Sequence, residues 1–151
     1  MTFDDGPVRD VTPKVLDVLD EHGAKAVFFL IGRKASEAPE LVRDIASRGH
    51  LIGNHSFSHP MDLLGVKQWM SELGRCQRTL SALCRADPVY FRPVQGRLRP
   101  SVMVAARRSR LRVVHWSFET DEYSYLKGAA VERIADNLVQ QARGRMDRLD
   151  A

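Results

Sequence analysis

The sequence predicts an α/β fold in which strands alternate with helices, built around a mostly parallel sheet or barrel. Two observations support this class. Short apolar runs bounded by turn residues alternate with longer segments whose apolar residues repeat at helical spacing. Polar and charged residues follow directly after the predicted strands, and the chemistry of such folds collects at the carboxyl ends of parallel strands.

The first thirty residues predict two strands and a helix. Phe3 closes a strand that has barely begun. Thr12 is predicted as the N-cap of a helix and Pro13 as its first residue, because both residue types favour these positions. Gly23 ends the helix, since glycine readily adopts the left-handed backbone found there. The continuous apolar run 26–31 is typical of a strand covered on both faces.

The middle of the chain predicts a second helix over residues 39–48, with Gly49 after it, and a short strand over residues 51–53 that leads to His55. The longest helix is predicted over residues 66–84. Its apolar positions keep helical spacing and are Trp69, Leu73, Cys76, Leu80 and Leu83.

The last third predicts a strand over residues 89–91, a helix over 100–109, a strand over 111–118 and a helix over 129–142. No linker, repeat or low-complexity run interrupts this series, so we expect one domain over residues 1–151.

Composition excludes several classes of protein. With 44% hydrophobic residues the chain is not a disordered protein. Its longest apolar run, 26–31, is far shorter than the ~18 residues of a membrane-spanning helix, and no signal peptide is evident in this chain. The net charge is +4, with arginine clusters at 107–112 and 143–148. These clusters lack interleaved aromatic residues, so we interpret them as solvated surface and expect no nucleic-acid partner.

The two cysteines are predicted to be free thiols. Cys76 and Cys84 are eight residues apart on one predicted helix, which separates them by ~12 Å. A disulfide requires Cα atoms within ~7 Å.

Two groups of residues carry candidate chemistry. Asp4 and Asp5 are adjacent carboxylates before a Gly-Pro pair, which indicates either a simple turn or a metal ligand beside a catalytic base. His55 and His59 are four residues apart, a spacing that lets two imidazoles share a cation if the segment is a helical turn. The alternative is an exposed loop with incidental histidines. The other histidines, His22, His50 and His115, are isolated and predicted to be surface or satisfied structural residues.

Two histidines and one aspartate supply three ligands and leave coordination positions open. Zinc, cobalt or iron suits such nitrogen and oxygen ligands. A second carboxylate nearby can take a proton from water, and Arg92 can hold that carboxylate ionised and oriented.

Three segments resemble, in order, the first three motifs of the polysaccharide deacetylases, also called the NodB homology domain or carbohydrate esterase family 4. They are Thr2–Pro7, His55–Pro60 and Phe91–Gly96. Residues 114–123 resemble a degenerate fourth motif. The resemblance covers essentially the whole chain, and its motifs are specific when taken together.

The resemblance implies a distorted (β/α) barrel that hydrolytically removes acetyl groups from N- or O-acetylated polysaccharides of the chitin, peptidoglycan or xylan type. By position, Asp4 matches the catalytic base and Arg92 the arginine that pairs with it. Asp5, His55 and His59 match the ligands of a single divalent metal ion, zinc or cobalt.

Two further roles follow from the resemblance. The backbone N–H of Gln95 matches the donor that stabilises the oxyanion, although the usual residue there is tyrosine. Trp116 falls near an aromatic residue that lines the substrate groove.

The chain also departs from the family pattern. Glu119 and Glu122 stand where aspartates are usual, and no histidine follows His115, although the family uses one as general acid in its fifth motif. We therefore expect a barrel incomplete at its first and last strands and a domain truncated at both ends. The alternative function is a catalytically impaired metal- or glycan-binding remnant. An extracytoplasmic location follows if a leader was lost upstream; the sugar, the compartment and the oligomeric state stay open.

Overall fold

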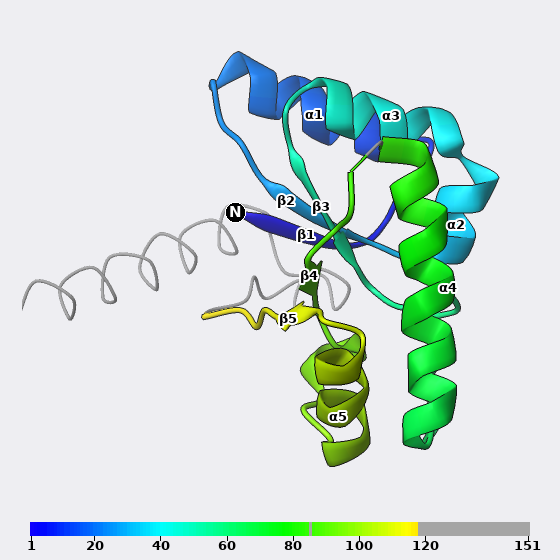
Figure 1. The fold of residues 1–151 in the computed structure, drawn as a ribbon. Helices are drawn as coiled ribbons and strands as arrows, with labels where there is room; N and C mark the ends of the chain where they lie inside the picture. Colours follow the sequence, from blue (N-terminus) through cyan, green and yellow to red (C-terminus); the bar gives the residue numbers. More distant parts are fainter. Residues whose placement is uncertain (85, 118–151) are drawn as a thin grey trace, which may run out of the picture. The chain divides into compact units, whose positions relative to one another are not determined.

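The computed structural model of the chain describes residues 1–84 and 86–117. The chain forms two compact units, residues 1–115 and residues 116–151. In the first unit, five strands form one parallel sheet in the order β1-β2-β3-β4-β5 (Figure 1). They are β1 (Thr2–Gly6), β2 (Val27–Leu30), β3 (Leu51–Asn54), β4 (Tyr90–Phe91) and β5 (Arg112–Val113). The predicted α/β class is confirmed, and within the described residues the sheet is open rather than closed into a barrel.

Helices connect the strands as predicted, with one addition. They are α1 (Thr12–Glu21), α2 (Gly32–Glu37), α3 (Pro39–Ser47), α4 (Val66–Cys84) and α5 (Pro100–Arg108), together with the 3₁₀ turn η1 (Val94–Gly96). The sequence did not predict α2, because a helix of six residues is too short to show an apolar period. The predicted strand 111–118 is too long, because β5 covers only Arg112–Val113 and residues 114–117 are not strand. The predicted helix 129–142 and the fourth-motif residues Glu119 and Glu122 lie outside the described residues.

The start of α1 corrects one expectation. Thr12 is the first helical residue rather than the N-cap, which is Val11, and no side chain caps this helix. Instead, the Thr12 hydroxyl accepts a hydrogen bond from the backbone N–H of Val8 at 2.9 Å. Thr12 therefore stabilises the turn before the helix, and Pro13 is the second helical residue rather than the first.

Helices α1 and α3 end where the sequence predicts, each at a glycine with a left-handed backbone. Gly23 has φ 59° and Gly49 has φ 76°. After α1, the N–H groups of Gly23 and Ala24 donate to the carbonyls of Asp20 and Leu19, which satisfies two carbonyls at the helix end.

The sheet has two chemically different faces. Helices α1, α3 and α4 follow one another along one face (Figure 1), and their apolar side chains pack on those of the strands in a buried cluster that includes Leu16, Phe28, Val42, Ile52 and Leu80. Because side chains alternate along a strand, Phe29 lies on the other face, under the guanidinium of Arg92. Arg92 and the Asp4 carboxylate that it pairs with belong to this second face.

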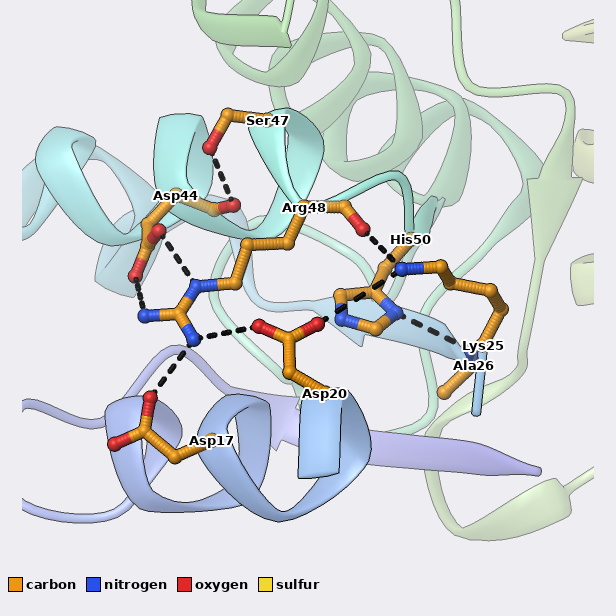
Figure 2. A network of polar contacts seen from close by, with 8 residues as sticks. All are labelled: Asp17, Asp20, Lys25, Ala26, Asp44, Ser47, Arg48 and His50. Carbon is orange, nitrogen blue, oxygen red and sulfur yellow. Dashed lines mark hydrogen bonds and ion pairs between the residues drawn. The ribbon is translucent and has the colours of Figure 1, made fainter. Parts of the chain in front are cut away.

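A polar network joins α1 to α3 (Figure 2). Nη1 of Arg48 lies 2.8 Å from Oδ1 of Asp17 and 2.9 Å from Oδ2 of Asp20, both on α1. Nε of Arg48 lies 2.9 Å from Oδ1 of Asp44 on α3. Hydrogen bonds to these carboxylates raise the pKa of Arg48, so it stays charged. Lys25 donates to the Arg48 carbonyl at 2.7 Å.

His50 lies beside this network and is neither a surface residue nor fully satisfied, contrary to the prediction. It is buried, and its Nδ1 accepts a 3.4 Å hydrogen bond from the N–H of Ala26. Its Nε2 has no hydrogen-bond partner in the described part of the chain. Burial lowers the pKa of His50.

The free state of both cysteines is confirmed. Burial raises the pKa of Cys76 to about 12, so this thiol is a small packed side chain rather than a nucleophile. No helix of the described residues is both long and apolar enough to span a membrane.

Candidate metal and catalytic site

The two adjacent aspartates form a β-bulge in β1. In β1, Phe3 pairs with Phe28 and Gly6 with Leu30, so Asp4 and Asp5 both lie opposite Phe29. Asp5 takes a left-handed backbone with φ 65°. The carboxylates thus lie within the last residues of the strand rather than in a turn after it. In a regular strand the side chains of neighbouring residues point to opposite faces, whereas the bulge lets both carboxylates reach one site, where Asp4 contacts Arg92 and Asp5 contacts the two histidines.

Asp5 meets both predicted histidines. Its Oδ1 lies 3.2 Å from Nε2 of His55 and 3.1 Å from Nε2 of His59. The three side chains each offer one ligand atom, and these atoms all lie within 4.8 Å of one another. The histidines do not lie on a helical turn: residues 55–59 form an irregular loop after β3. The predicted trio is nevertheless brought together.

The geometry and chemistry of this trio fit a divalent metal ion. Ligands ~2.0–2.1 Å from a tetrahedral zinc lie roughly 3.3 Å from one another, close to the distances observed. Nδ1 of buried His55 is 2.8 Å from the Arg92 carbonyl, an arrangement that leaves Nε2 as the ligand atom. The hydrogen bond with His55 lowers the pKa of Asp5, and burial lowers that of His59. Both shifts favour the states that bind metals.

Asp4 points to Arg92, as predicted. Nη1 of Arg92 lies 2.8 Å from Oδ1 of Asp4 and donates at 2.7 Å to the hydroxyl of Thr2. The guanidinium is 3% exposed and stacks 4.3 Å above the ring of Phe29. Burial raises the pKa of Asp4, although electrostatic interactions with His55 and Arg92 act against it. Asp4 is therefore an oriented carboxylate with enhanced affinity for a proton, beside the trio.

Gln95 and Trp116 are the remaining predicted site residues. Gln95 is exposed in η1, has φ 52°, and lines a small hollow with Met61 and Trp69. Trp116 belongs to the second unit. Their predicted roles as oxyanion donor and groove aromatic stay predictions. His115 is exposed, with Nε2 3.2 Å from the Gly96 carbonyl.

Two residues that support the site were not predicted from the sequence. Thr2 binds Arg92, and its position two residues before Asp4 on one strand indicates that both side chains lie on the same face. The second is Glu72, which accepts hydrogen bonds from the backbone N–H groups of Phe57 and Ser58. No sequence signal links a helix residue to a loop fourteen positions earlier.

The fold and site define an α/β protein with a candidate mononuclear metal centre and an adjacent carboxylate–arginine pair. The chain belongs to the polysaccharide deacetylase family, whose sequence model matches residues 1–114.

Curated relatives agree with this assignment. A peptidoglycan-N-acetylglucosamine deacetylase of Bacillus cereus is 34% identical over 92% of this chain and 50% of its own length. A chitooligosaccharide deacetylase of Azorhizobium caulinodans is 34% identical over 95% of this chain and 68% of its own length. The chain thus spans between half and about two thirds of these relatives.

Solved structures share the fold. A family 4 carbohydrate esterase from Streptomyces lividans, in complex with acetate, superposes with a TM-score of 0.81 and 31% identity, covering 89% of this chain and 69% of that one. A mutant of a family 4 pseudoenzyme, with restored enzymatic activity, superposes with a TM-score of 0.84 and 26% identity, covering 92% of this chain and 50% of that one. A family 4 esterase and a mutant of a family 4 pseudoenzyme therefore both share this fold.

Proposed function

We propose that the chain carries the metal-dependent hydrolysis of acetyl groups on N-acetylated glycans of the peptidoglycan or chitooligosaccharide type, with O-acetylated glycans as further substrates. One observation carries the proposal: the Asp5–His55–His59 trio lies beside an Asp4 carboxylate held by Arg92. The named activities of the B. cereus and A. caulinodans relatives support the substrate class. Because peptidoglycan lies outside the cytoplasm, we expect the reaction to take place there.

Zinc is the ion that we propose for the trio, with cobalt as a substitute. When bound, such an ion polarises the acetyl carbonyl and lowers the pKa of water. Asp5 supplies an exposed carboxylate, His55 a buried imidazole and His59 a partly buried one. The exposed side of the trio, at Asp5, is where a large glycan has access.

Asp4 is proposed as the general base. Its carboxylate lies beside the trio, in position to take a proton from the attacking water. Arg92 fixes the carboxylate by a direct ion pair and is itself fixed by Thr2 and Phe29. The base therefore keeps one orientation through the reaction. The N–H of Gln95 is the proposed donor to the developing oxyanion.

A second candidate function is a metal- or glycan-binding domain with impaired catalysis. One observation favours it: a mutant of a family 4 pseudoenzyme shares this fold. The Asp4–Arg92 pair and the complete trio favour catalysis.

Acetate release distinguishes the two functions. The purified chain, loaded with zinc, is incubated with chitooligosaccharides and with peptidoglycan fragments, and acetate is quantified beside an Asp4→Asn control. Release that depends on both zinc and Asp4 supports the deacetylase. Glycan binding without release supports the second function, and release that is equal in the Asp4→Asn variant contradicts the proposed base.

A further inference from the structure

The loop that carries both histidines has an unfavourable backbone. Ser56 has φ 65° and His59 has φ 56°, values in the left-handed region. For residues other than glycine this conformation costs roughly 1–2 kcal/mol each. Two such residues in a five-residue loop require support from the surrounding structure.

Helix α4 supplies that support through one side chain. Oε2 of Glu72 accepts the N–H of Phe57 at 3.1 Å and the N–H of Ser58 at 2.7 Å. These successive N–H groups lie between His55 and His59, and together they form a small anion-binding concavity for the carboxylate. Hydrogen bonds to an ionised oxygen are roughly twice as strong as neutral ones.

The loop is also held from its other side. The N–H of Gly32 donates to the Ser56 carbonyl at 3.0 Å, and the N–H of Arg33 donates to the Phe57 carbonyl at 2.9 Å. Helix α2 therefore binds the loop's carbonyls, whereas Glu72 binds its N–H groups.

Glu72 is a suitable anchor because its helix is rigidly packed. Its neighbour Leu73 and the nearby Cys76 are fully buried. The amide of Asn54, the residue before His55, donates to the Leu73 carbonyl at 3.0 Å. One turn of α4 thus binds both Asn54, at the start of the histidine segment, and the N–H groups in its middle.

We propose that Glu72 is a positioning residue for the metal site: it holds the 55–59 loop in the conformation that brings the two imidazoles to Asp5. This inference rests on the metal binding proposed above. Glu72 is not itself a metal ligand and acts on the site only through the loop that it binds. Removal of such outer supports typically weakens metal affinity ~10–100-fold.

The test compares zinc affinity, by competition with a chromophoric chelator, in the whole chain and in Glu72→Leu, Glu72→Gln and Glu21→Gln. Glu21, an exposed residue on α1, controls for loss of a carboxylate. We expect Glu72→Leu to weaken zinc binding ~10–100-fold, Glu72→Gln to weaken it several-fold, and Glu21→Gln to leave it unchanged. A role limited to general stability lowers the thermal midpoint of the metal-free protein without weakening zinc binding at temperatures where the protein is folded. That result overturns the proposal.

Amide hydrogen exchange of Phe57 and Ser58 in the metal-free protein provides a second readout. Both amides are expected to exchange faster in Glu72→Gln than in the unaltered chain. If the unaltered chain binds no zinc, the metal part of the proposed function fails. The support of the loop by Glu72 is then tested by hydrogen exchange alone, and equal exchange rates in Glu72→Gln and in the unaltered chain overturn it. If Glu72→Leu does not fold, Glu72→Gln decides, and unchanged zinc affinity together with unchanged exchange contradicts the role.

Discussion

The ring of Phe29 lies so close to Gly53 on the neighbouring strand that a Cβ atom there would be 2.4 Å from Cδ1 of the ring. The other relevant contact of Phe29 is with Arg92, whose guanidinium lies 4.3 Å from the ring centre. Because Arg92 in turn holds Asp4, the absence of a side chain at position 53 helps to determine where the base lies.

Replacing Gly53 with alanine is therefore expected to displace Phe29 and loosen Arg92. Crowding of this kind costs about 1–3 kcal/mol of stability. Urea unfolding and acetate release, measured together, check the prediction; both are expected to fall. Gly74→Ala on α4 is the control, because its Cβ meets only an arginine Nη1 at 3.5 Å. That helical substitution is expected to raise stability by roughly 0.5–1 kcal/mol, and a loss at position 74 as large as that at position 53 would count against the crowding argument.

The two aspartates are expected to separate metal binding from catalysis. Asp4→Asn is expected to lower turnover ~10²–10⁴-fold and leave zinc binding largely intact, because Asp4 is not a ligand. Asp5→Asn is expected to lose zinc. Zinc content of the dialysed variants and acetate release give both answers, and loss of zinc from the Asp4 variant would show that the roles are reversed.

The leaving group should affect the rate strongly. An amide must release an amine, which requires a proton donor, whereas an ester releases an alcohol that needs less help. We therefore expect O-acetyl glycans to be hydrolysed faster than matched N-acetyl glycans. The measurement is acetate release at equal zinc. Equally fast N-deacetylation would point to a proton donor in this chain, with His115 tested first by substitution with glutamine.

Stability should fall in mild acid because of His50. Burial lowers its pKa in the folded chain below the ordinary 6.5, with the charge of Lys25 as the next cause. The unfolded chain therefore binds a proton more readily, and stability is lost as pH falls from about 6.5 through the lowered pKa. Asp20, Arg48 and Asp44 also act on this pKa, the carboxylates raising it and Arg48 lowering it.

The free energy of unfolding in urea between pH 7.5 and pH 5 tests this expectation. His50→Gln is expected to flatten part of the decline, whereas His22→Gln, at an exposed position after α1, is expected to follow the unaltered chain. Identical pH slopes for the His50 variant and the unaltered chain would contradict a role for His50.

Arg48 is expected to stabilise the contact between α1 and α3 (Figure 2). Arg48→Met removes a guanidinium that contacts carboxylates on both helices, and Arg48→Lys keeps the charge but not the planar set of donors. Both variants are expected to lower the thermal midpoint, methionine more than lysine, with a smaller difference at high salt. Arg43→Met, exposed on α3, is the matched control, and an equal effect there would remove the argument for the network.

The metal trio shows how far residue patterns can predict a site. Asp5, His55 and His59 were identified by residue type, spacing and resemblance, and the structure brings them together. The means differs from the expectation, since the histidines lie on an irregular loop rather than a helical turn. Loop conformation depends on partners such as Glu72 and Gly32, which are distant in sequence from at least one histidine, so spacing alone does not define it.

The sequence by itself determined the parallel α/β class, the helix ends at Gly23 and Gly49, and the identities of the metal and base candidates. These follow from local periodicity, backbone preference and the chemistry of side chains. The tertiary structure decided that the neighbouring residues Asp4 and Asp5 serve one site, since that depends on a bulge opposite Phe29 in another strand. It also decided that Gly53 makes room for Phe29 and that Glu72 supports the histidine loop. These contacts join residues that only strand pairing and helix packing bring together, and no local pattern records them.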